Sequence, residues 1–237
     1  MKKTLFFTLA VLLTIYFASC KDDTITGGGG NETPSISGKI ENWHLGSDKK
    51  LYLLANAGDT VIRSFILDSC NIDSLGNFTI NLKAPVDSML MYFRFNDSLC
   101  THHSIISPMG VRYCYSEFLV KGSSTSYLGS LSRSNDSVQL PYTGKIFAYS
   151  YYFNAGGSIT GTDTCNYGQP VMIEHNEVTQ TRGWNSLFVV YDSVTSNVIR
   201  VSITTQPHTV QWYFSGIYDK NENLGKIYRR NPYFKGR

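Results

Sequence analysis

Two alternating runs occupy residues 199–214, Ile-Arg-Val-Ser-Ile-Thr-Thr-Gln-Pro-His-Thr-Val-Gln-Trp-Tyr-Phe. Apolar side chains stand at positions 199, 201 and 203 of the first run and at 210, 212 and 214 of the second. A period of two buries one face of a β-strand and leaves the other face to water. The preceding residues 184–191 are apolar on both faces, as in a central strand. We therefore predict a three-stranded antiparallel meander over residues 184–218.

Strand patterns also fill the first folded third of the chain. Strand-like segments occur at residues 36–40, 51–54 and 61–67, and residues 68–80 contain a strand, a turn at 75–77 and a returning strand. No apolar stripe of helical period is longer than two turns. The predicted fold class is therefore all-β, with two small antiparallel β-sandwich-like units at 35–98 and 145–230. An irregular connecting segment is expected at 99–144, where Ser, Gly and Asn are frequent.

The composition and the motifs exclude several classes of function. The 237 residues include 21 Lys and Arg and 18 Asp and Glu, which gives a net charge of +3 without a basic run. Such a chain has no electrostatic footprint for nucleic acid, so no nucleic-acid partner is expected. It has no Gly-x-Ser-x-Gly, no His-Glu-x-x-His and no phosphate-binding glycine loop. We therefore predict no catalytic residues, no cofactor and no metal.

The N-terminus carries the sharpest motif. Met1-Lys-Lys precedes an apolar run from Leu5 to Phe17, and Ala18-Ser-Cys20 follows it. The run is too short to span a bilayer as a helix. This stretch resembles a bacterial lipoprotein signal, with residues 1–19 as signal peptide and 20–34 as lipidated cysteine and flexible tether. The resemblance implies that acyl chains such as palmitate on Cys20 anchor the protein in the outer membrane.

Two further observations concern the anchor. The residues after Cys20, Lys21-Asp-Asp23, resemble a short signal that sends some Gram-negative lipoproteins to the cell surface. The alternative is an ordinary secretory signal cut near Ser19, which would leave Cys20 as a free thiol.

The N-terminal unit has a resemblance of its own. A Gly-x-Ile start at Gly38, a Leu-Tyr-Leu strand at 51–53 and the pattern Asp-x-x-Gly-x-Phe ending at Phe78 are similar to a small β-sandwich domain. That domain occurs at the N-terminus of lipoproteins that carry a thioredoxin-like domain. The sequence has no Cys-x-x-Cys, so the resemblance brings no thioredoxin-type activity with it.

Four cysteines follow Cys20, and an even set outside the cytoplasm favours disulfides. Cys100 and Cys114 flank one irregular segment and are predicted to pair. Cys70 is predicted to pair with Cys165 if the two units pack together. The alternative is a metal site at Cys100, His102 and His103, but the spacing lacks a second half-site.

One strand suggests a binding surface. Within residues 145–153, an aromatic strip of four rings falls on one face: Phe147, Tyr149, Tyr151 and Phe153. Such a strip can form a platform for sugar rings, and it can equally form a core layer. A second candidate is His175 with Glu177, which share a strand face as an acid–base pair would. A surface ion pair is the alternative there.

Together these patterns predict a lipid-anchored extracytoplasmic protein for binding or scaffolding, with a glycan or a partner protein as its ligand. The membrane is its expected partner through the anchor, and its expected location is the outer membrane at the cell surface. The alternative is an extracytoplasmic hydrolase acting on glycan or peptide. An acidic pair in a cleft would favour the hydrolase, whereas an aromatic strip without carboxylates would favour the binding protein.

Overall fold

The computed structural model describes residues 33–57, 63–92, 98–123 and 126–216, and this part of the chain is built almost entirely of strands. The predicted all-β class is confirmed. The first seven strands and one short 3₁₀ helix are β1 (Ser35–Lys39), β2 (Lys49–Ala57), β3 (Arg63–Ile72), β4 (Asn77–Asn81), η1 (Asp87–Met89), β5 (Met91–Tyr92), β6 (Cys100–Thr101) and β7 (Ile105–Ser107). The remaining strands are β8 (Arg112–Lys121), β9 (Tyr127–Ser134), β10 (Ile146–Phe153), β11 (Gly157–Cys165), β12 (Val171–Gln180), β13 (Gly183–Val194), β14 (Val198–Thr204) and β15 (Gln211–Gly216). Within the described residues, no helix is long and apolar enough to cross a membrane.

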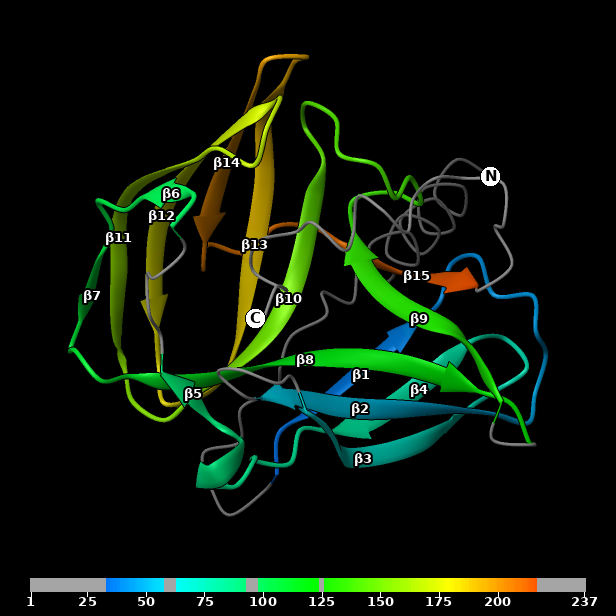
Figure 1. The fold of residues 1–237 in the computed structure, drawn as a ribbon. Helices are drawn as coiled ribbons and strands as arrows, with labels where there is room; N and C mark the ends of the chain where they lie inside the picture. The colour runs from blue at the N-terminus through cyan, green and yellow to red at the C-terminus, as the bar shows by residue number, and fades with distance from the viewer. Residues whose placement is uncertain (1–32, 58–62, 93–97, 124–125, 217–237) are drawn as a thin grey trace, which may run out of the picture.

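The strands form one large sheet and one small one. The large sheet follows the order β3-β2-β8-β9-β10-β13-β14-β12-β11-β6, with β15 on β9, β5 on β8 and β7 on β11. The small sheet pairs β1 with β4. In Figure 1, β10, β13, β14, β12 and β11 stand upright on one side, while β8, β2 and β3 run across the other. Nearly all pairs are antiparallel, but β12 and β14 run parallel. The chain reverses from β12 to β13 and again from β13 to β14, so β14 runs in the direction of β12 and lies between the two.

The predicted meander at 184–218 is partly wrong. Strands β13 and β14 form the expected antiparallel pair. The next strand, β15, leaves this pair and lies antiparallel to β9, so that Trp212 faces Arg133 and Phe214 faces Leu131. Alternation predicted the burial of Trp212 and Phe214 but placed Tyr213, which is also buried, on the face toward water. It carried no information about the strand that neighbours β15, since pairing is a non-local property of the chain.

The prediction that residues 99–144 are irregular is also wrong. Two long strands, β8 and β9, lie within them. Strand β8 pairs with β2 along most of its length, and near its start Tyr113 and Tyr115 face Phe153 and Tyr151 of β10. Its two faces serve different cores: Cys114, Phe118 and Val120 belong to the first, and Tyr115 to the second. The segment therefore joins the two halves of the molecule.

The first core lies between the small sheet and the large one. Trp212 is its largest fully buried side chain. Its ring meets Phe78 of β4 edge-on at 5.1 Å between centroids and Phe118 of β8 at 4.9 Å. Gly38 lies directly beneath, because a Cβ at that position would come within 2.5 Å of the indole. The predicted Gly-x-Ile segment thus has a glycine where the tryptophan needs the space.

The second core lies against the inner face of the upright strands. Its buried members lie on β8, β10, β11, β12, β13 and β14 and directly before β8. They are Val111, Tyr115, Tyr151, Phe153, Ile159, Val178, Leu187 and Ile203. These residues do not fill the space completely, and the pocket described next lies among them.

Candidate functional site

A pocket opens on the inner face of the upright strands. Its cavity volume is about 50 Å³, which is more than a single water requires. Side chains at every second position of each strand line it, as the period of two dictates. The thirteen lining residues are Tyr113 of β8, Tyr149 and Tyr151 of β10, Ile159 of β11, Met172, Glu174, Asn176 and Val178 of β12, Leu187, Val189 and Tyr191 of β13, and Val201 and Ile203 of β14.

The predicted aromatic strip faces this inner side. Phe147 is 5% exposed, Tyr151 8% and Phe153 0%, so the four rings do not form an open platform. Tyr149 and Tyr151 line the pocket. Phe153 stacks on Tyr151 at 6.1 Å between centroids, and Phe147 contacts Tyr149 at 6.4 Å. The strip is thus part core and part pocket wall.

Sequence reasoning missed the polar residues of the pocket. Glu174 and Asn176 are 4% and 5% exposed, and both line it. The candidates His175 and Glu177 lie on the opposite face of β12 and are exposed. His175 there contacts Thr162, with 3.2 Å between Nδ1 and Oγ1. The signal that could have found them is the alternation of β12. Glu174 and Asn176 lie at even positions, on the same strand face as the apolar residues Met172 and Val178.

Two tyrosines of the pocket, Tyr151 and Tyr191, are held neutral. Burial raises the pKa of Tyr151 far above its ordinary value, and the neighbouring phenols and the Glu174 carboxylate raise it further. Burial also raises the pKa of Tyr191, again with the Glu174 charge adding to the effect. Both phenol groups therefore sense the negative charge of Glu174 and stay protonated at any physiological pH.

A buried aspartate closes one end of this region. Asp163 stands opposite Glu174 in the β11–β12 register and is 1% exposed. Its Oδ1 accepts hydrogen bonds from the backbone N–H groups of His103 and Ser104, at 2.8 and 3.0 Å. The Nδ2 of Asn176 donates to Ser104 Oγ at 3.0 Å. Asp163 thus anchors the loop before β7 and is not among the pocket residues.

The loop can approach β11 so closely because of Gly161. A Cβ at this position would lie 2.6 Å from the carbonyl oxygen of His103. The imidazole of His102 lies beside the same carboxylate, with 3.7 Å between its Nδ1 and Asp163 Oδ2. The histidines of the predicted metal alternative therefore belong to the packing around Asp163. Among the described residues, no group of three or more His, Cys, Asp or Glu is arranged to hold a metal ion.

The predicted disulfide pairing is wrong. Cys100 is bonded to Cys165, its direct partner in the β6–β11 register. Cys114 lies in the first core, opposite Tyr152 of β10, and Cys70 lies on β3, at the other edge of the large sheet. Proximity in sequence suggested the pair Cys100–Cys114, but β6 pairs with a strand that follows 65 residues later. A bridge across a loop of that length is worth about 4 kcal/mol in the chain-entropy description.

The two remaining thiols are unreactive. Burial raises the pKa of Cys114 to about 12 and that of Cys70 to about 11. A thiol is nucleophilic as its thiolate, so neither group has the character of a catalytic cysteine. The predicted lipidation site, Cys20, lies outside the described residues.

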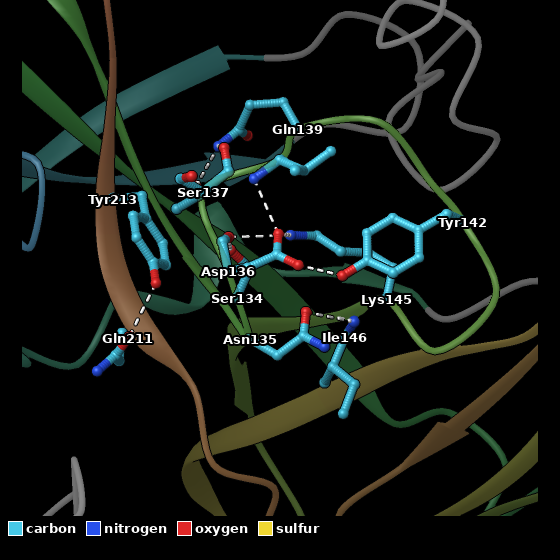
Figure 2. Close-up of polar contacts among 12 residues, drawn as sticks. Ser134, Asn135, Asp136, Ser137, Gln139, Tyr142, Lys145, Ile146, Gln211 and Tyr213 are labelled. Atoms are coloured by element: carbon cyan, nitrogen blue, oxygen red, sulfur yellow. Dashed lines mark hydrogen bonds and ion pairs between the residues drawn. The ribbon is translucent and has the colours of Figure 1, made fainter.

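A second polar cluster holds the loop before β10 (Figure 2). Lys145 is fully buried, and its Nζ donates to Asp136 Oδ1 at 2.6 Å and to the Asp136 carbonyl oxygen at 2.9 Å. The hydroxyl of Tyr142 donates to Asp136 Oδ2. The Lys145 ammonium also lies 4.8 Å from the centre of the Phe147 ring. This cluster fixes the start of β10 and hence the register of the aromatic strip.

The pKa of Asp136 reflects two opposing effects in this cluster. Partial burial opposes ionisation of its carboxyl group, but the hydrogen bonds from Lys145 and Tyr142 outweigh it and lower the pKa. The carboxylate is therefore ionised at neutral pH and pairs with a buried cation, which is a structural arrangement. None of the thirteen pocket residues takes part in it.

No protein family, curated protein or solved structure matches this chain.

Proposed function

We propose that this protein is a lipid-anchored extracytoplasmic binding protein that takes a small organic ligand into the pocket of the upright strands. The observation that carries the binding proposal is the inward aromatic strip, whose Tyr149 and Tyr151 line a pocket. Concave sites with mostly apolar walls and a few convergent polar groups are the usual form of small-molecule sites. Here Glu174 and Asn176 supply the polar groups.

The anchor part of the proposal is supported by the N-terminal motif ending at Cys20. Acyl chains contribute about 0.8 kcal/mol per buried CH₂, so several chains on one cysteine hold a protein at a membrane. The location that follows is the outer membrane, with the surface-export-like residues after Cys20 in favour of the cell exterior.

The pocket gives less support to a glycan-binding platform and to a glycosidase. A glycan platform needs rings that face solvent, whereas Phe147 and Phe153 are buried. A glycosidase of the usual kind needs two carboxyl groups facing its substrate. Two buried carboxyl groups, those of Asp163 and Glu174, are neighbours across β11 and β12. Glu174 lines the pocket, whereas Asp163 accepts a hydrogen bond from the loop before β7.

Binding is tested by titrating the protein with benzyl alcohol, a small neutral aromatic probe, followed by backbone NMR shifts. We expect the shifts to gather on β10, β12, β13 and β14. The variant Val189→Phe places a ring in the pocket and should abolish the shifts. Val190→Phe is the matched control, because the neighbouring residue points to the other face of β13. Shifts scattered over the surface, or unchanged binding by Val189→Phe, would refute the pocket.

The anchor is tested separately with Cys20→Ser. The variant should remain unacylated and should no longer sediment with outer membranes after a high-salt carbonate wash. If it still does, the lipoprotein reading is wrong.

A further inference from the structure

Among the residues that the structure describes, one charged side chain lines the pocket, and its charge is negative. Glu174 is the charged side chain among the thirteen lining residues, which the structure describes in full, and no Lys, Arg or His is among them. A ligand in this space therefore meets negative charge at the polar end of the pocket.

Burial makes that charge effective. Glu174 is 4% exposed: Met172 and Asn176 flank it on the pocket face of its own strand, and Val201 lies beside it on β14. An incoming cation gains more from the Glu174 carboxylate than from a surface carboxylate, since water screens the attraction less at a buried site.

The rings around Glu174 favour the same kind of ligand. Tyr113, Tyr149, Tyr151 and Tyr191 all line the pocket, and Tyr113 and Tyr151 stack with 5.9 Å between centroids. The face of a tyrosine ring carries the negative part of its quadrupole and attracts an ammonium group. Because the phenols of Tyr151 and Tyr191 remain protonated, they add no competing charge of their own. Four such rings beside one buried carboxylate form an environment suited to an organic cation.

Resting on the proposed binding function, we infer that the pocket selects organic amines: the ammonium group pairs with Glu174, and the hydrocarbon part lies against the tyrosine rings and the aliphatic wall. The aliphatic wall is formed by residues such as Val189 and Leu187 of β13. A carboxylic acid of the same size is repelled, and a neutral alcohol binds without the charge contribution.

The experiment compares three probes of nearly equal size by NMR titration: benzylamine, benzyl alcohol and benzoate. Hydrogen bonds to charged groups contribute about 1.5–3 kcal/mol, and about 1.4 kcal/mol corresponds to tenfold in affinity. We therefore expect benzylamine to bind at least tenfold more tightly than benzyl alcohol, and benzoate to bind more weakly than either.

Two substitutions on one strand separate charge from structure. Glu174→Gln keeps the size of the side chain and should lower the affinity for benzylamine at least tenfold, with benzyl alcohol changed less than about threefold. Glu177→Gln is the matched control, because Glu177 lies on the exposed face of β12, and it should change neither. Thermal melting of both variants tests whether the fold is retained. Should Glu174→Gln fail to fold, the ranking of the three probes on the unaltered protein still decides.

The rings are tested at Tyr149. Tyr149→Phe keeps the ring and should bind benzylamine within about twofold, whereas Tyr149→Leu should lose about three- to tenfold. If benzyl alcohol binds as tightly as benzylamine, the amine selectivity is refuted and the binding function stands. If none of the three probes binds, both the selectivity and the binding function are refuted.

Discussion

Asp136→Asn is expected to destabilise the protein by about 2–3 kcal/mol at neutral pH. The substitution removes the negative partner of Lys145, whose side chain is fully buried, while the Asp136 carbonyl oxygen at 2.9 Å remains as its acceptor. Breaking a fully buried ion pair costs about 3–5 kcal/mol, and an exposed pair is worth about 0.2–1 kcal/mol. Since the Asp136 side chain is 36% exposed, solvent screens part of the interaction and the expected value lies between these limits.

The effect should depend on pH with a definite sign. The pKa of Asp136 is lowered in the folded protein, so its carboxylate stabilises the fold above its ordinary pKa, near 4. This contribution is lost as the pH falls through the lowered folded value. The gap in unfolding free energy between the protein and Asp136→Asn should therefore stay constant from about pH 7 to about pH 5 and shrink as the pH falls below about 4.

The assay is urea unfolding followed by tryptophan fluorescence, with Asp87→Asn as the control. Asp87 pairs with Arg112 at 2.7 Å, nearly the same distance, but its side chain is 80% exposed. The control should lose less than about 1 kcal/mol. Equal losses for the two variants, or a gap at Asp136 that does not narrow in acid, would refute the argument from burial.

Two further results are expected. In a Cys20→Ser variant, Cys70 and Cys114 should resist a thiol reagent in the folded protein, because burial raises their pKa to about 11 and about 12; unfolding should expose two thiols, and unfolding with reductant four. One fast-reacting thiol in the folded protein contradicts this. Gly38→Ala should lower stability by about 1–3 kcal/mol, since its Cβ would lie 2.5 Å from the buried indole of β15. Gly122→Ala, whose Cβ meets nothing closer than 3.7 Å, should be nearly neutral, and urea unfolding measures both variants.

Alternation along the sequence carried much of the fold, because it depends on neighbours in the chain. It predicted the strand around Val201 and Ile203 and the returning strand through Phe78, and both are present. Pairing depends on contacts between distant residues. The chain gave no local sign that β15 would join β9 or that Cys165 would meet Cys100.

The residues of the candidate site, too, could be predicted from the sequence only in part. Tyr149 and Tyr151 were found because aromatic rings at alternate positions are a strong local pattern. Glu174 was passed over in favour of His175 and Glu177, since an acid beside an imidazole is a familiar chemical pair. Glu174 lines the pocket because it is on the buried face of β12. Whether a polar residue is buried depends on the apolar residues that share its strand face and on the elements that pack against that face.

The position of Trp212 has a consequence for how the chain comes into being. A polypeptide leaves the ribosome, and crosses a membrane in an unfolded state, amino end first. Phe78 and Phe118 emerge early, while the ring that packs between them arrives after most of the chain has been made. Until β15 emerges, the first core lacks its largest buried side chain, and the early strands present apolar faces that other chains or chaperones can occupy. Completion of the N-terminal half therefore waits for one of the last strands to be synthesised.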